Sequence, residues 1–294
     1  MYESIFLNCC GSNIYTALGA LDKLKHNLEN VKIYNVSGNA SLILYCKILG
    51  LTYKQTYDKL KNLDIINSFI NGHSLLPEDE EEKKEFIKDY LIKLQRKTLI
   101  KENTTLLEVK NLTGITPCFI VWNRTLKKII NLNSKDTPDL KLIDCVMATL
   151  PNIGVYKTYT INNQEYSSLE NIECFPVSYS YYNDIDKFFY LINITTYIKE
   201  YSLGINLGLL KDIEDEFLLQ KGEYHKYRIE NFCKSLPKNE NICKLYSLFS
   251  RGNSKEEEKT SLFILGYRQA SGYLEEKDTH KIYEEYLETI FKQA

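Results

Sequence analysis

The first fifty residues alternate between short apolar runs and segments whose apolar side chains recur at helical spacing. Residues 5–7 form an apolar run typical of a strand, and the leucines of residues 15–24 then lie near one helical face. Gly19 within that face predicts the close approach of another element. Residues 31–36 begin with the alternation of a strand, and residues 40–50 are apolar nearly all round, as in a buried helix.

The rest of the chain continues this order of elements. Further helices are predicted at residues 52–63, 78–94, 104–112, 140–150 and 255–276. Further strands are predicted at residues 118–122, 128–131 and 188–194. Strands that alternate with helices indicate an α/β fold with a mostly parallel sheet. Because no linker or repeat interrupts the pattern, we predict one domain over residues 1–294, with a core at 4–180 that residues 181–294 complete.

The charge of the chain excludes some classes of partner. Lys and Arg number 37 against 39 Asp and Glu, so the net charge is −2, and no nucleic-acid partner is expected. The chain is rich in Tyr, Ile, Asn and Lys, and only 5 of its 37 basic residues are Arg. AT-rich codons favour this composition, which indicates an AT-rich genome such as that of a large DNA virus or a protist.

Eight cysteines are spread along the chain without a CxxC pair or a nearby histidine at zinc-finger spacing. They are interpreted as buried free thiols in a reducing compartment, with no metal site and no cofactor. The N-terminus lacks the basic start of a signal peptide. The most apolar run, residues 42–49, contains Lys47 and is far shorter than the ~20 residues that span a bilayer. The sequence therefore predicts an intracellular, cytoplasmic protein without a transmembrane segment.

The turn at Gly38 has the layout of a nucleophile elbow, in which a strand leads through a tight glycine turn into a buried helix. A G-x-S-x-G pattern that begins at Gly38 requires serine at position 40 and glycine at position 42. The sequence has Ala40 and Leu42 instead. The scaffold of a serine hydrolase is thus predicted without its nucleophile.

Several motifs in the same order make residues 4–276 resemble the patatin-like phospholipase family, in the form found in large DNA viruses and bacteria. The family elbow, G-T-S-A-G, matches Gly38-Asn39-Ala40-Ser41-Leu42. The family's glycine-rich oxyanion loop with its basic residue matches residues 7–13. Only one glycine of the triplet remains there, and Asn13 stands at the basic position; the remnant of the loop comprises Cys9, Cys10, Gly11 and Asn13.

The aspartate motif of the family, Y-V-D-G-G, aligns with residues 166–170, which read Tyr-Ser-Ser-Leu-Glu. Ser168 therefore stands at the aspartate position, and Glu170 replaces a glycine. Thr149 takes the place of a second family serine. The positions that the family uses as framework persist, namely Gly19, Gly38, Gly50, Pro138 and Pro176.

The resemblance implies a three-layer α/β/α sandwich and hydrolysis of lipid acyl esters by a Ser–Asp dyad. In the family, the serine attacks the ester carbonyl, the aspartate acts as base and the glycine-rich loop stabilises the oxyanion. With Ala40 and Ser168 at the dyad positions, the resemblance implies a catalytically degenerate member, a pseudoenzyme with a binding, regulatory or structural role. Its partner would be a lipid or a protein, and its oligomeric state is open. We also expect Ser168 to lie close to Ala40 in space.

Two other interpretations remain open. Ser41, one residue beyond the expected place, could be a relocated nucleophile in an active lipid acyl hydrolase, although such a shift turns a helical side chain by about 100°. Candidate bases for this chemistry lie in polar, surface-like contexts: His26, His73, His225 and His280. The third interpretation is an unrelated α/β binding module, which would lack the strand–turn–helix at Gly38.

Overall fold

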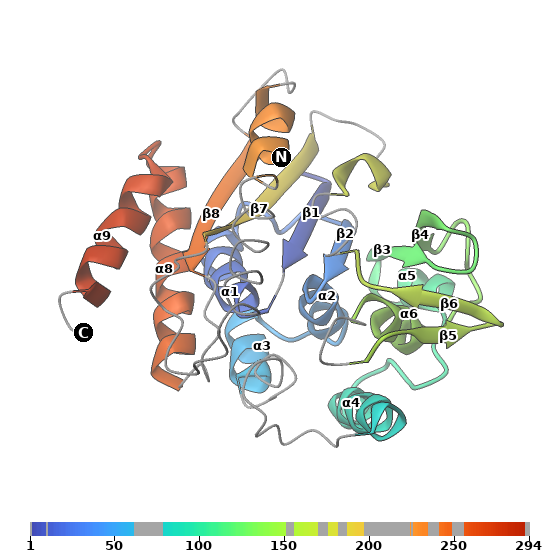
Figure 1. The fold of residues 1–294 in the computed structure, drawn as a ribbon. Helices are drawn as coiled ribbons and strands as arrows, with labels where there is room; N and C mark the ends of the chain where they lie inside the picture. Colours follow the sequence, from blue (N-terminus) through green and yellow to red (C-terminus); the bar gives the residue numbers. More distant parts are fainter. Residues whose placement is uncertain are drawn as a thin grey trace, which may run out of the picture.

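A mixed sheet of eight strands forms the centre of the computed structural model, with helices packed against it (Figure 1). The structure describes residues 2–9, 11–61, 79–150, 156–169, 176–181, 187–196, 224, 226–234, 241–248 and 256–291. None of the helices within these ranges is both long and apolar enough to cross a membrane.

The sheet has a parallel centre and an antiparallel edge. Its strands are β1 (Ser4–Cys9), β2 (Ile33–Gly38), β3 (Thr116–Asn123), β4 (Lys128–Asn133), β5 (Tyr159–Ile161), β6 (Gln164–Ser167), β7 (Phe188–Thr196) and β8 (Ile242–Leu248). The order is β5-β6-β3-β2-β1-β7-β8, and β4 pairs with β3. All pairs from β3 through β2, β1 and β7 to β8 are parallel, whereas β4, β5 and β6 form antiparallel pairs.

The helices form where the sequence supplies both an apolar stripe and a starting signal. They are α1 (Asn13–Leu24), α2 (Ala40–Ile48), α3 (Tyr53–Leu60), α4 (Glu80–Gln95), α5 (Leu106–Thr113), α6 (Leu142–Thr149), α8 (Glu256–Leu274), α9 (Thr279–Phe291) and the short 3₁₀ helix η1 (Val177–Tyr179). Thr52 is the N-cap of α3 and Thr105 is the N-cap of α5. Each forms a capping box with the residue three positions later. Asp79 accepts hydrogen bonds from the first backbone amides of α4.

The two faces of the sheet carry separate apolar cores, because successive strand residues point to opposite sides. Ile5 and Leu7 of β1 belong to the main core, which also contains residues of α1 to α6 and α8. Phe6, between them, belongs to a smaller core on the other face, together with Ile229 of a helical segment at residues 226–234. The helices therefore flank the sheet on both faces, as an α/β sandwich requires.

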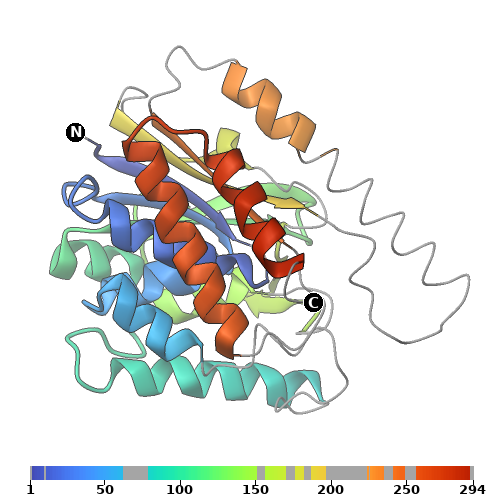
Figure 2. The same cartoon turned by 90° about the vertical axis from the view of Figure 1, so that its left-hand side faces the viewer.

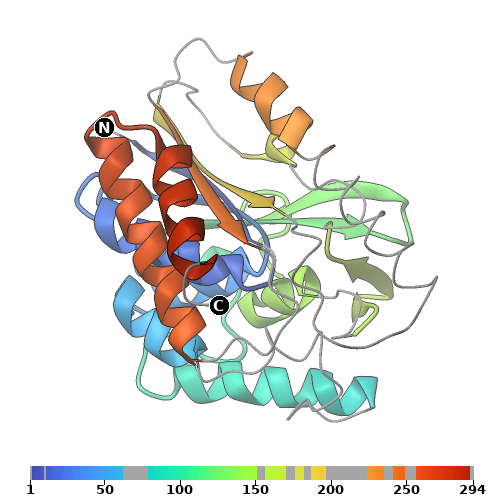
Figure 3. The ribbon, with the colours of Figure 1, turned by 60° about the vertical axis from the view of Figure 1, so that its left-hand side comes forward.

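Helices α1 and α8 touch backbone to backbone through two glycines. A Cβ atom on Gly19 would overlap the carbonyl oxygen of Phe263, and one on Gly266 would overlap the carbonyl oxygen of Thr16. Figures 2 and 3 show α8 and α9 side by side on the same side of the sheet. The close approach predicted at Gly19 is confirmed, and its partner is α8.

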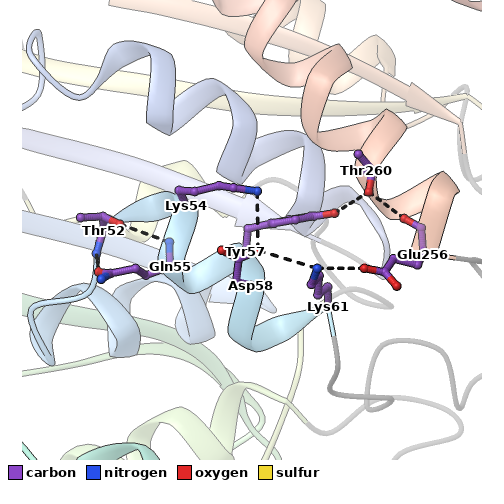
Figure 4. A network of polar contacts seen from close by, with 8 residues as sticks. All are labelled: Thr52, Lys54, Gln55, Tyr57, Asp58, Lys61, Glu256 and Thr260. Atoms are coloured by element: carbon purple, nitrogen blue, oxygen red, sulfur yellow. Dashed lines mark hydrogen bonds and ion pairs between the residues drawn. The ribbon is translucent and has the colours of Figure 1, made fainter.

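Polar contacts fix the start of α8 to the end of α3 (Figure 4). The Tyr57 hydroxyl lies 2.9 Å from the Thr260 hydroxyl, and Lys61 Nζ lies 2.9 Å from a Glu256 carboxylate oxygen. The buried Lys259 donates to the Lys61 carbonyl oxygen at 2.6 Å. These contacts join segments about 200 residues apart and set the position of α8 over α1.

The elements predicted from the sequence are present, with ends shifted by a few residues, and the α/β fold class is confirmed. The strands β5, β6 and β8 and the helix α9 were not predicted. All of the cysteines in the described ranges are buried and free, as expected. Burial raises the pKa of the Cys46 thiol to about 12, which keeps this thiol protonated and unreactive at neutral pH.

Candidate functional site: the glycine turn after β2

The predicted strand–turn–helix forms at the end of β2. Gly38 closes β2 with a φ of 60°, a left-handed conformation that glycine adopts without steric cost. Asn39 is the N-cap of α2 and already has right-handed dihedrals, and Ala40 is the first helical residue. In a nucleophile elbow the nucleophile sits on the strained turn. Here Gly38 takes the left-handed conformation, and Ala40 is a fully buried methyl group at the start of a regular helix.

The loop after β1 contacts this turn directly. Cys9 pairs with Gly38 at the end of the β1–β2 ladder, and its carbonyl oxygen accepts a hydrogen bond from Asn39 N at 3.0 Å. Asn39 Nδ2 donates to the carbonyl oxygen of Gly11 at 3.4 Å, and Gly11 has a φ of 49°. The structure thus brings the elbow and the oxyanion-loop remnant together. Cys10 lies outside the described residues.

Asn13, at the position of the family's basic residue, is turned away from the elbow. It begins α1, it is almost fully buried, and its Oδ1 accepts a hydrogen bond from the Ser247 hydroxyl at 2.5 Å. Ser247 belongs to β8, which lies on the opposite side of β1 from β2. The contact therefore directs this carboxamide along the sheet, away from Ala40.

Strand β6 continues the line of β2 along the same edge of β3. Strands β4 and β2 occupy opposite edges of β3, because Cys118 and Phe119 pair with both. At Trp122 and Asn123, β3 pairs with β4 and also with β6. Strand β6 must therefore lie on the edge that β2 occupies, beyond the point where β2 ends.

Ser168 follows β6 directly and lies at the carboxyl end of β2 for this reason. The last β2–β3 pair is Val36 with Phe119, and the β6–β3 pairing starts again at Ser167 with Trp122. The register places Ser168 beside the turn that begins at Gly38, despite about 130 residues of chain between them. Ser168 is buried, and Glu170 lies outside the described residues.

A buried asparagine of β2 holds the backbone of Tyr181. Asn35 Nδ2 donates to the carbonyl oxygen of Tyr181 at 3.0 Å, and its Oδ1 accepts from Tyr181 N at 2.6 Å. Asn131 of β4 also donates to the carbonyl oxygen of Tyr179 at 2.9 Å. These paired amides position residues 176–181 on the smaller core. No sequence signal singled out Asn35 for this role.

Ser41, the alternative nucleophile, points into the protein. Its side chain is fully buried, and its Oγ lies 2.6 Å from the hydroxyl of Thr149 on α6. The Thr149 hydroxyl also donates to the carbonyl oxygen of Val146 at 2.7 Å. The Thr149 hydroxyl, which donates to Ser41 Oγ and to the Val146 carbonyl oxygen, has one proton and shares it between these two acceptors. The Ser41 oxygen is engaged in packing α2 against α6.

The described segments around the turn contain no charged acid or base. Residues 8–9, 11–13, 37–42 and 166–169 include no Asp, Glu, His, Lys or Arg. His26 lies beyond the far end of α1, and the ring of His280 packs 4.8 Å from Tyr246. His73 and His225 lie outside the described residues. Within the described ranges, no three His, Cys, Asp or Glu side chains are grouped to bind a metal ion.

No family model and no curated protein matches the sequence. The structure does have similar solved structures. One is VipD from Legionella pneumophila, with a TM-score of 0.55 at 10% identity over 94% of this chain and 67% of VipD.

Another similar structure is the type III effector ExoU, with a TM-score of 0.51 at 13% identity over 94% of this chain and 53% of ExoU. The chain has a patatin-like fold. A third is the heterodimeric complex of ExoU with SpcU from Pseudomonas aeruginosa, with a TM-score of 0.53 at 12% identity over 94% of this chain and 51% of that one. The chain therefore spans about half the length of ExoU, and identities this low establish the patatin-like fold alone.

Proposed function

We propose that this chain is a patatin-like protein that has lost the Ser–Asp acyl-hydrolase dyad and acts by binding. The observation that carries the proposal is the fully buried Ala40 at the start of α2, where the fold would present a nucleophile. Ser168, at the base position, offers a neutral hydroxyl that cannot accept a proton as a carboxylate does. Asn13 replaces the basic residue of the family's oxyanion loop, and its Oδ1 accepts a hydrogen bond from Ser247.

A relocated nucleophile is the alternative, and the contacts of Ser41 argue against it. A serine nucleophile needs an adjacent base and a free approach for the substrate carbonyl. Ser41 is fully buried, and its hydroxyl bonds Thr149, which has no basic group. Reaction at Ser41 would require α2 and α6 to separate.

An esterase assay with an activated short-chain ester tests the proposal. We expect wild-type protein to release no more product than the buffer blank. Ser41→Ala is the matched control, because it removes the alternative nucleophile and leaves the rest of the turn unchanged. Turnover by the wild type that disappears in Ser41→Ala would replace the proposal with the relocated nucleophile.

The partner class is a lipid or a protein, and two observations bear on it. The inference that this chain binds a lipid rests on analogy with other proteins of patatin-like fold. The ExoU structure in complex with SpcU is an example of this fold bound to another protein. Mass spectrometry of the purified chain under mild conditions would distinguish the two, because a retained lipid gives a defined added mass.

We also propose that the chain forms a single domain, that it is intracellular and that it is of viral origin.

A further inference from the structure

The turn that follows α4 presents a leucine among positive charges. Leu99 is 77% exposed, more than any other large hydrophobic side chain in the described ranges. Residues 93–102 contain four basic residues and a single carboxylate, that of Glu102. The basic side chains are all exposed: Lys93, Arg96, Lys97 and Lys101. Among the described residues, none of these four cations forms an ion pair.

Hydrogen bonds hold this turn in one conformation. Thr98 N donates to the carbonyl oxygen of Gln95 at 2.9 Å, and the Thr98 hydroxyl accepts from Ile100 N at 3.2 Å. Lys101 Nζ donates to the carbonyl oxygen of Thr98 at 2.9 Å. Ile100 is buried in the main core. Because its neighbour is anchored inward and the backbone is fixed, Leu99 is held outward.

Local structure explains only part of this pattern. Cations in the last turn of a helix interact favourably with the negative end of the helix dipole, which accounts for Lys93 and Arg96. Lys101 donates to the Thr98 carbonyl oxygen, but neither this bond nor the dipole gives a reason for an exposed leucine at the turn. The combination of a fixed apolar side chain and surrounding cations is a feature of surfaces that meet anionic interfaces.

We propose that this turn is a contact site for an anionic lipid surface. Leu99 enters the headgroup region, and the four cations interact with lipid phosphates and carboxylates. A bilayer accepts a single convex side chain at any position. A stable protein partner would require about 800 Å² on this chain with a cluster of apolar or aromatic anchors. Leu99 is the one exposed large hydrophobic side chain of residues 93–102, all of which the structure describes, so the lipid surface fits better.

The position of the turn allows such a contact. The connection from α4 to α5 lies at the rim of the molecule, at the lower left in Figure 2. Figure 3 shows the same connection at the lower left again, beyond the end of α4. A flat surface can therefore approach it from outside. The contact does not depend on the chemistry of the glycine turn and stands apart from the proposed loss of catalysis.

Co-sedimentation of the full chain with vesicles tests the proposal. We expect binding to phosphatidylcholine vesicles that contain about a third phosphatidylserine, weakened by added salt, and no binding to pure phosphatidylcholine. Leu99→Ser should weaken binding about tenfold, the loss expected for one apolar side chain. Arg96→Ala with Lys97→Ala should weaken it about 25-fold, since one cation near an anionic membrane contributes about fivefold.

The turn between β3 and β4 provides a matched control, because its leucine also lies among cations but is less exposed, 48% at Leu126 against 77% at Leu99. Leu126→Ser removes the leucine that lies between Arg124 and Lys127, and we expect binding within twofold of the wild type. Each variant is compared at equal folded fraction by circular dichroism. The proposal fails if the wild type does not bind anionic vesicles, which would favour an acidic protein partner. It also fails if Leu99→Ser binds like the wild type, or if Leu126→Ser causes the larger loss.

Discussion

Two regions of this molecule depend on glycine, and they differ in how many of the expected glycines they contain. At the α1–α8 contact, Gly19 and Gly266 each face a backbone carbonyl of the other helix, and both are still present. At the turn after β2, Gly38 is present in its left-handed conformation, but alanine and leucine occupy the two other motif positions. The turn has the backbone layout of a nucleophile elbow, and position 40 carries no hydroxyl.

The difference shows which constraints a fold imposes by itself. The helix contact fails as soon as a methyl group is added, so packing alone requires both glycines. The strand–turn–helix needs Gly38 for its backbone, but nothing in its packing requires a hydroxyl at position 40. Ala40 is buried in the main core. A fold does not by itself require the chemistry that other proteins perform on it.

The largest expected effect is at the helix contact. Gly266→Ala should lower the free energy of unfolding by about 3 kcal/mol, because α8 must move away from the Thr16 carbonyl oxygen. Chemical denaturation with urea measures the change. Gly272→Ala on the same helix is the control: its Cβ would meet the flexible end of the Ile282 side chain, and we expect less than half the loss. Equal losses of unfolding free energy in the two variants would show that a glycine facing backbone at the helix contact is no more constrained than one facing a flexible side chain.

Restoring the dyad residues should have a smaller effect on stability and none on activity. Ala40→Ser with Ser168→Asp places a carboxyl group at a buried position, which should cost about 2 kcal/mol at pH 7. Burial raises the pKa of such a carboxyl above its unfolded value, so the cost should shrink as the pH falls toward 4. Thermal melts at pH 4 and pH 7 measure this change.

The same double variant should remain without esterase activity, because residues 9–13 keep only one glycine of the family's triplet and no basic residue. Losing one oxyanion donor typically costs ~10²–10³ in rate. Ala40→Ser alone is the control, since it adds the hydroxyl without the buried carboxyl. Ester hydrolysis by the double variant at the rate of an active serine hydrolase would show that the pocket is intact, contrary to the comparison drawn above.

The smallest expected effect is at the contact between α2 and α6. Thr149→Val keeps the side-chain shape but removes the hydroxyl that bonds both Ser41 and the Val146 carbonyl oxygen. We expect a loss of about 1–2 kcal/mol in the free energy of unfolding. Ser41→Ala should cost less, because Thr149 keeps its bond to Val146. If Ser41→Ala proves the more damaging of the two, Ser41 has a role beyond packing.

Local patterns in the sequence predicted most of the fold. Helical spacing of apolar residues located α1 and α8, the nearly continuous apolar stretch at residues 40–50 located α2, and Gly19 indicated the close approach of another element. The β5–β6 hairpin was missed because its strands are three and four residues long, although Asn162 and Asn163 at its turn both have positive φ. Such short strands are stabilised by their pairing with β3, which is a long-range contact without a local signal.

The candidate site was predictable in its residues but not in its contacts. The glycine turn and the missing serine could be read directly from residues 38–42. The family resemblance alone led us to expect Ser168 close to Ala40. Local sequence gives no such signal, because the place of Ser168 depends on the change from β2 to β6 along one edge of β3. The bonds of Asn13 to Ser247 and of Asn35 to Tyr181 likewise depend on strands brought together only by folding.

Labelling with a fluorophosphonate probe is the most direct test of the central claim, which is that the patatin-like fold is present here without a reactive serine. The intact wild-type chain is incubated with the probe and its mass is measured, with an active serine hydrolase as the positive control. We expect no covalent adduct on this chain when the control is fully labelled. An adduct located on Ser41 by peptide mass spectrometry, and lost in Ser41→Ala, would contradict it.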